Sequence, residues 1–124
     1  MSWWTNLVSR LRRFPPPDPE VRVREGGFDV ISVDKELRLA TVNWKDVDQI
    51  ETYKLDLITT DCVCLLFRIG DEEVQLSEEW EGFHTLFGPL NDNFPSIGDD
   101  WYANVVQPPF EAKRTVLFTS SEAA

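Results

Sequence analysis

The residues with the most chemical potential in this chain are two cysteines, Cys62 and Cys64, and a single histidine, His84. Thiolates and imidazoles bind zinc, but a stable site needs four such ligands and the chain offers three. A packed or surface histidine is favoured over a catalytic one, because general-base catalysis needs a positioned partner. The sequence also has no Gly-rich phosphate loop, no metalloprotease helix motif and no nucleophile elbow. We therefore expect a protein that is not an enzyme and that uses neither a metal nor a cofactor.

The two cysteines are two residues apart within an apolar run that is typical of a strand. Side chains at positions i and i+2 share one face of a strand, with Cα atoms about 6.6 Å apart. That separation is near the upper limit for a disulfide. Two reduced thiols in a cytoplasmic protein are the simpler interpretation.

Acidic side chains form three clusters, none of which matches the twelve-residue calcium loop. The clusters are Glu78/Glu79/Glu81, Asp46/Asp48 and Asp99/Asp100. Solvated faces and helix N-termini explain most of them. The net charge of −10 disfavours nucleic-acid binding, because an acidic surface repels phosphates. The same charge could attract a basic partner, although its simplest meaning is solubility.

The first 14 residues differ in charge from the rest of the chain. They contain Arg10, Arg12 and Arg13 and no acid, whereas the remaining residues hold nine basic and 22 acidic side chains. One apolar stripe recurs at helical spacing: Trp3, Trp4, Leu7, Val8, Leu11 and Phe14. We expect residues 1–14 to form an amphipathic basic helix. Residues 15–20, which are rich in proline, should form an extended tether.

Three interpretations of this N-terminal helix stay open. It packs on its own domain, it lies on an anionic membrane with Trp3 and Trp4 at the interface, or it binds a protein partner or a second copy. Its apolar residues precede its arginines, which is not the order of a secretory signal, and no apolar run approaches the ~20 residues of a membrane span. We expect a cytoplasmic protein, with peripheral membrane contact as the alternative. The predicted interaction residues are Trp3, Trp4, Leu7, Arg10, Leu11, Arg12 and Arg13, followed by Glu78, Glu79 and Glu81.

Beyond the tether, the hydrophobic period changes to two, which predicts strands. The expected strands are residues 21–24, 28–33, 37–42, 47–57, 62–69, 73–76 and 115–119. Residues 62–69 are apolar on both faces, so this strand should be central. A helix capped by Ser77 should end or kink at Gly88-Pro89, and a shorter one should span residues 99–106. We expect residues 21–119 to form one domain and residues 120–124 to form a flexible tail. Trp44, Phe67 and Trp80 are expected in the core.

The phrase Trp44-Lys45-Asp46-Val47-Asp48-Gln49-Ile50, between two expected strands, resembles a step in bacterial pleckstrin-homology-like domains. Residues 53–61 and 77–82 are similar to a group of small uncharacterised bacterial proteins. The resemblance covers about residues 21–93 and implies an α+β fold, in which a capping helix covers a strongly bent antiparallel sheet or split barrel. Lipid-binding members use a basic loop between their first two strands. That loop here is Glu25-Gly26-Gly27 and has no base, so phosphoinositide binding is not implied.

These observations predict a non-enzymatic protein-interaction module. One alternative is a small acidic immunity-type inhibitor that blocks a basic toxin or nuclease through charge complementarity. Another is a peripheral membrane-associated adaptor that is anchored through residues 1–14.

Overall fold

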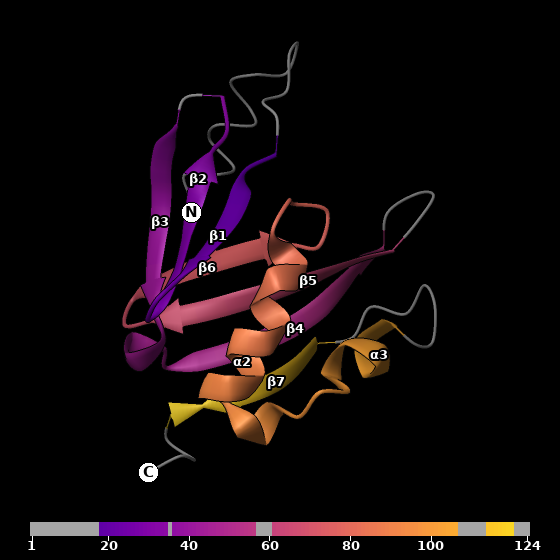
Figure 1. Ribbon diagram of the computed structural model, residues 1–124. Helices are drawn as coiled ribbons and strands as arrows, with labels where there is room; N and C mark the ends of the chain where they lie inside the picture. The colour runs from indigo at the N-terminus through magenta and orange to yellow at the C-terminus, as the bar shows by residue number, and fades with distance from the viewer. Residues whose placement is uncertain (1–17, 35, 57–60, 107–113, 121–124) are drawn as a thin grey trace.

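The described strands form two antiparallel sheets whose strands run across each other (Figure 1). The computed structural model describes residues 18–34, 36–56, 61–106 and 114–120. The three-stranded sheet contains β1 (Glu20–Arg24), β2 (Gly27–Ser32) and β3 (Leu37–Asn43) in that order. The four-stranded sheet has the order β6-β5-β4-β7, with β4 (Gln49–Asp56), β5 (Asp61–Ile69), β6 (Glu72–Ser77) and β7 (Arg114–Thr119).

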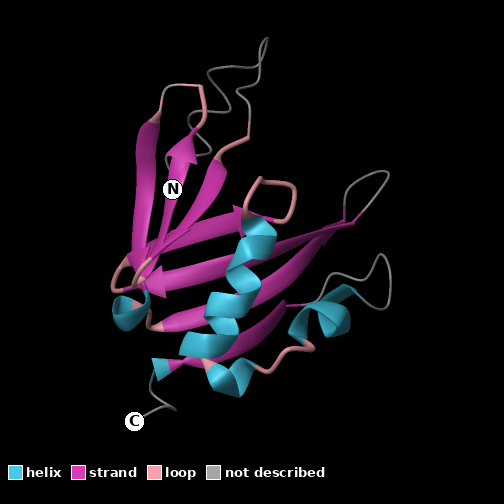
Figure 2. Cartoon of the chain, in the orientation of Figure 1, coloured by secondary structure: helices cyan, strands magenta, loops and turns pink. Residues whose placement is uncertain are grey.

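Short helices connect the strands and cover one face of the four-stranded sheet (Figure 2). They are η1 (Trp44–Asp46), η2 (Phe83–Leu86), α2 (Phe87–Asn93), η3 (Pro95–Ile97) and α3 (Trp101–Val106). The 3-10 helix η1 links β3 to β4 and therefore joins the two sheets. The predicted α+β class is confirmed, and each strand lies close to its expected position.

Strand β5 pairs with β4 on one side and with β6 on the other, so the predicted central strand is confirmed. Alternate side chains of a strand point to opposite faces. Val63, Leu65 and Phe67 belong to the hydrophobic core between the two sheets and the helices, which we call the main core. Cys62 and Cys64 are buried but lie outside the main core, as does Leu66. The continuous apolar run of this strand therefore reflects burial on both faces.

The main core lies between the two sheets and the helices. The Phe67 ring centroid is 5.0 Å from that of Phe28 and 6.5 Å from that of Trp44, so β5, β2 and η1 meet at these rings. Every helix of the described ranges sends buried side chains into this core: Trp44, Phe83, Leu86, Leu90, Ile97, Trp101 and Val105. The expected core positions of Trp44 and Phe67 are confirmed.

The predicted helix from Ser77 begins too early. Ser77 is the last residue of β6, and its Oγ accepts a hydrogen bond from the Glu79 N–H at 3.1 Å within a turn. Gly82 has φ of 88°, a left-handed conformation that interrupts a right-handed helix. Helical structure therefore starts at Phe83. Trp80 lies in the turn and is half-buried against the edge of the core, so its predicted core position is wrong.

The pair Gly88-Pro89 does not end the helix, which is one of the two predicted outcomes there. Both residues lie in the first turn of α2, where a missing proline N–H leaves no helical hydrogen bond unmade. The predicted helix at residues 1–14, the tether up to residue 17 and the tail from residue 121 lie outside the described residues.

Candidate functional site

A groove of about 300 Å³ follows the edge strand β6, which among the described strands pairs only with β5. We call it the β6 groove. Its apolar lining is Val30, Ala40, Leu55, Cys64, Leu66, Val74, Leu76 and Trp80, and its acidic lining is Asp18, Glu73 and Glu79. Gln75 and Ser77 complete it. An apolar lining with a few polar groups is typical of binding sites, and this volume is at the small end of their range.

The register of the sheets brings these residues together from distant parts of the sequence. Val30 of β2 pairs directly with Ala40 of β3 in the three-stranded sheet. On the four-stranded sheet, Leu66 pairs with Gln75 and therefore shares a face with it. That face is opposite the one covered by the helices, because the alternate β5 residues belong to the main core.

The two cysteines are buried in the four-stranded sheet. Both are free and buried, and the Cys62 Sγ lies 3.1 Å from the Ser77 Oγ. Burial raises the pKa of the Cys64 thiol to about 12, so the reactive thiolate is scarce at neutral pH. Within the described ranges, no three or more His, Cys, Asp or Glu side chains gather into a group that could hold a metal ion.

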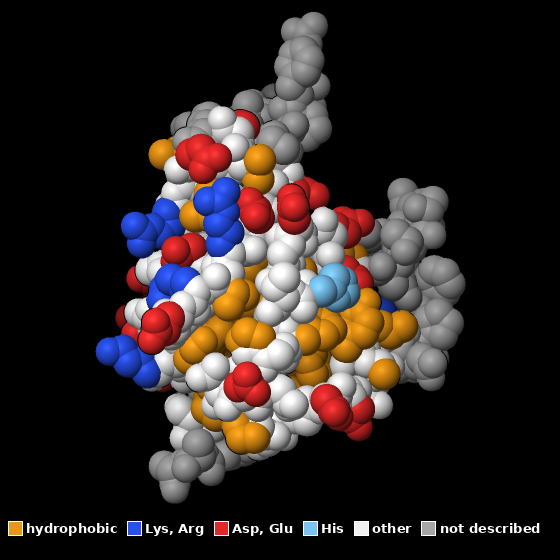
Figure 3. Space-filling model, in the orientation of Figure 1, with side chains coloured by type: hydrophobic (Ala, Val, Ile, Leu, Met, Phe, Trp, Pro, Cys, Tyr) orange, Lys and Arg blue, Asp and Glu red, His pale blue; other side chains and the backbone are white. Residues whose placement is uncertain are grey.

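The histidine lies among aromatic rings rather than beside a catalytic partner. The centroid of the His84 ring is 5.1 Å from that of Phe87 and 5.8 Å from that of Tyr102. Phe87 in turn lies 5.1 Å from Trp101. In Figure 3 the chain's single histidine borders a gathering of hydrophobic side chains on the helix-covered face. Phe87 and Tyr102 pack against the main core, so this aromatic patch covers the core on its helix side.

The three glutamates of the predicted acidic site have different surroundings. Glu78 uses both carboxylate oxygens inside the domain, accepting hydrogen bonds from the Val63 N–H and, at 2.6 Å, from the Tyr102 hydroxyl. The hydrogen bond to Glu78 raises the pKa of Tyr102 to about 12. The side chains of Glu79 and Glu81 are exposed, and Glu79 lines the β6 groove. The cluster therefore combines a structural glutamate with surface glutamates.

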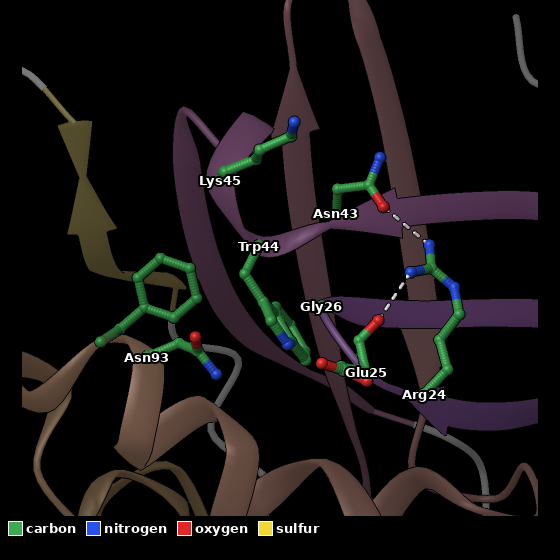
Figure 4. Close-up of a pocket in the computed structure, with 8 residues that line it drawn as sticks. Arg24, Glu25, Gly26, Asn43, Trp44, Lys45 and Asn93 are labelled. Carbon is green, nitrogen blue, oxygen red and sulfur yellow. Dashed lines mark hydrogen bonds between the residues drawn. The ribbon is translucent and has the colours of Figure 1, made fainter.

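A second hollow, of about 440 Å³, lies where the β1–β2 turn meets η1 and the end of α2 (Figure 4). Arg24 lines it, but the Arg24 guanidinium is already engaged in holding the three-stranded sheet together. It donates to Asp29 Oδ1 at 3.2 Å, to Thr41 Oγ1 at 2.8 Å and to Asn43 Oδ1 at 2.8 Å. These bonds leave the hollow with the opposed charges of Glu25 and Lys45, and with no basic cluster among its described lining residues.

Lys54 is a buried charge that the strand pattern did not single out. Its Nζ donates to the carbonyl oxygen of Val106 at 3.0 Å, at the C-terminal end of α3. A cation is favoured there by the exposed carbonyls of the last helical turn. Lys54 therefore fastens α3 to β4 on the core face of the sheet.

A charged network lies on the far face of the same sheet, which is the face that points away from the main core. Glu51 is 5% exposed, and its carboxylate accepts from Arg114 Nε at 2.7 Å and from Arg68 Nε at 3.2 Å. Burial raises the pKa of Glu51, but the hydrogen bonds from Arg114 and Arg68 outweigh it, so the pKa lies below its usual value. The network connects β7 to β4 and β5, and Glu51 pairs with Leu66 of the β6 groove.

Changing Glu51 to glutamine should lower the free energy of unfolding at pH 7 by roughly 1–3 kcal/mol, the range for hydrogen bonds to charged groups. A lowered folded pKa means that this stability is fully present above the unfolded pKa of about 4.3 and is lost as the pH falls through the folded value. The difference between the two proteins in urea denaturation should therefore shrink below about pH 4. A difference that stays constant from pH 7 to pH 3 would contradict this account.

Comparison with protein-family models, with curated proteins and with solved structures found no match to this chain. The described residues form an α+β domain with two open antiparallel sheets and short helices. Among the helices of the described ranges, none has the length and apolar character needed to cross a bilayer.

The predicted site residues thus fall into two groups. Those of the N-terminal helix lie outside the described residues, and of the acidic cluster only Glu79 lines the β6 groove. The apolar lining of the groove was not predicted as a site. The apolar character of both faces of β5 was the sequence signal for it, because Cys64 and Leu66 needed a second buried environment.

Proposed function

We propose that this protein is a non-enzymatic protein-interaction module that binds a basic amphipathic segment in the β6 groove. The observation that carries the proposal is the combination of an apolar lining with the acidic side chains of Asp18, Glu73 and Glu79 in one hollow. Apolar anchors gain affinity by leaving water, and opposite charges at the rim select and orient the partner.

The surroundings of the chemically capable side chains favour binding over catalysis. The buried thiols and the aromatic setting of His84 support structural roles for these residues. Glu78 and Tyr102 satisfy each other through a short hydrogen bond. We therefore assign these residues to the framework that supports the groove.

The pleckstrin-homology-like resemblance is part of the same proposal. Two antiparallel sheets with crossing strands, joined through η1 and covered on one side by α2, are compatible with a bent sheet and a capping helix (Figure 1). Strand β7, which adds to β4 after α3, is a departure from the simple pattern. A fold of this type hosts many functions, so the site rather than the fold specifies the partner.

An immunity-type inhibitor of a basic toxin or nuclease is the second candidate. The net charge of −10 and the exposed carboxylates of Glu79 and Glu81 favour it. Its mark would be fast binding that weakens steeply with salt, as expected for electrostatic steering. The membrane-adaptor alternative depends on residues 1–14 and stays a sequence prediction.

The test compares Glu79→Lys with Glu81→Lys, because both change the charge equally in the same exposed connection but only Glu79 lines the groove. The probe is a fluorescein-labelled amphipathic helical peptide with leucine and tryptophan on one face and arginine on the other. We expect Glu79→Lys to weaken binding about three- to tenfold, the effect of a rim charge, and Glu81→Lys to weaken it less.

Fluorescence anisotropy should be recorded at low and high salt. It should be recorded on the full chain and on a Leu7→Asp/Leu11→Asp variant, which disrupts the apolar stripe predicted in residues 1–14. A matched peptide with glutamate in place of arginine should not bind. Equal binding of the two peptides would overturn the proposal. So would equal effects of the two lysine substitutions, or no binding to either chain at peptide concentrations up to about 1 mM, which marks an affinity too weak to be specific.

A further inference from the structure

The far face of the four-stranded sheet contains buried apolar side chains that the main core does not account for. Cys62, Cys64 and Leu66 are 3%, 1% and 5% exposed, yet none belongs to the main core. In the described parts of the chain, the buried residues of every helix belong to the main core on the opposite face. The helices of the described ranges therefore do not supply the cover of these side chains.

The β6 groove begins where the described chain begins. Asp18, the first described residue, lines the groove. Only residues 15–17, all prolines, separate Asp18 from Phe14. Because a chain spans at most about 3.6 Å per residue, the four steps from Asp18 to Phe14 keep the two residues within roughly 14 Å of each other. The N-terminal stripe is therefore tethered close to the groove.

The charges of residues 3–14 and of the groove are also complementary. Residues 3–14 contain three arginines and no acid, whereas the groove carries Asp18, Glu73 and Glu79. A helix of twelve residues would be about 18 Å long. Such a short helix is marginal in isolation and needs an apolar surface on which to fold.

We infer that residues 3–14 of this chain dock their apolar stripe in its own β6 groove, with the arginines toward the acidic rim. The inference rests on the proposed function, because it assigns an internal occupant to the same site. The site is then closed in the free protein, and an external basic amphipathic segment binds by displacing the internal one. The tether keeps the internal segment at high effective concentration, so only a partner of higher intrinsic affinity opens the groove.

The thiol of Cys64, which lines the groove, reports on its occupation. Iodoacetamide labelling of the full chain, located by fragment mass spectrometry, should be slow. In the Leu7→Asp/Leu11→Asp variant, called the stripe variant, Cys64 should be alkylated at least about tenfold faster. The free energy lost when even one leucine is no longer buried corresponds to more than a tenfold change in the docking equilibrium. The control Asn6→Asp/Ser9→Asp adds the same charge to the polar face and should alter the rate by less than about twofold.

A second measurement holds even if the stripe variant unfolds, which near-ultraviolet circular dichroism would reveal. With benzoylphenylalanine in place of Trp4, irradiation of the full chain should cross-link residue 4 to peptides from β5 or β6 of the same chain. Cross-links between chains would assign the segment to a second copy. Cross-links to other strands, or a Cys64 rate that is equal in the stripe variant and in the control, would also overturn the inference.

The peptide measurements separate this inference from the proposed function. If the stripe variant binds the basic peptide more tightly than the full chain does, both proposals hold. Equal binding by the two chains supports the groove as a site but overturns its occupation by residues 3–14. If neither chain binds the peptide while labelling and cross-linking give the expected results, the groove is an intramolecular packing surface and the proposed function is wrong.

Discussion

Replacing Phe67 with alanine is expected to lower the free energy of unfolding by about 3–5 kcal/mol. The side chain is 0% exposed, near the C-terminal end of β5, with the rings of Phe28 and Trp44 beside it. These neighbours belong to different elements, so their backbones limit how far they can collapse into the space left behind. Single domains are stable by about 5–15 kcal/mol, so this loss would remove a large share of the total.

Urea denaturation followed by tryptophan fluorescence measures the effect. Leu37→Ala is the matched control, because Leu37 is 53% exposed at the start of β3. Its free energy of unfolding should change by no more than about 0.5 kcal/mol. If Phe67→Ala destabilised the protein no more than the control does, the position of Phe67 at the centre of the core would be wrong.

The second large effect is expected for Gly82→Ala. Gly82 has φ of 88°, and a Cβ there would lie 1.9 Å from the carbonyl oxygen of Val21. A left-handed conformation alone costs a non-glycine residue roughly 1–2 kcal/mol. The clash with backbone adds to this, because β1 or the connection must move. We expect a total loss of at least about 3 kcal/mol in the free energy of unfolding.

The matched control is Gly70→Ala, because Gly70 also has positive φ, at 60°, but a Cβ there would meet no atom within 4 Å. It should lose only the conformational part, roughly 1–2 kcal/mol. Thermal unfolding followed by circular dichroism compares the two. Equal melting temperatures for the two variants would show that the contact between Gly82 and β1 has no energetic importance.

The Gly82 substitution also has a consequence for the groove. The Val21 N–H donates to the Glu81 carbonyl at 2.8 Å, which holds the connection after β6 against β1. Glu79 and Trp80 lie on that connection and line the groove. Moving the connection should therefore weaken binding of the basic peptide at temperatures where the variant is still folded.

The strands could be read from the sequence because their signal is local. Alternation with period two depends only on which face of each strand is buried, and turn residues mark the ends. Burial of β5 on both faces followed from the same argument, since residues 62–69 are apolar at successive positions. Extended segments separated by short turns also favour antiparallel pairing, which both sheets show.

The helix after β6 was misplaced because helical spacing can occur without a helix. Trp80, Phe83 and Phe87 are three and four residues apart, but Gly82 adopts a left-handed conformation between the first two. Contact with β1 favours that conformation, since the close approach of Val21 leaves no room for a side chain at Gly82. This contact joins residues 61 positions apart and has no signature in a local window.

Composition and local pattern are therefore sufficient for the α+β class, for the acidic character of the chain and for the basic charge of its first 14 residues. Each of these properties depends on residues that are close together in the chain. The β6 groove depends instead on strand register, which sets Val30 against Ala40 and Leu66 against Gln75, and on the turn that carries Glu79. The same long-range packing directs Glu78 inward, to Val63 and Tyr102, although its neighbour Glu79 stays exposed. Adjacent residues of one type thus acquire different roles, because each role depends on which distant strand or helix lies beside the side chain.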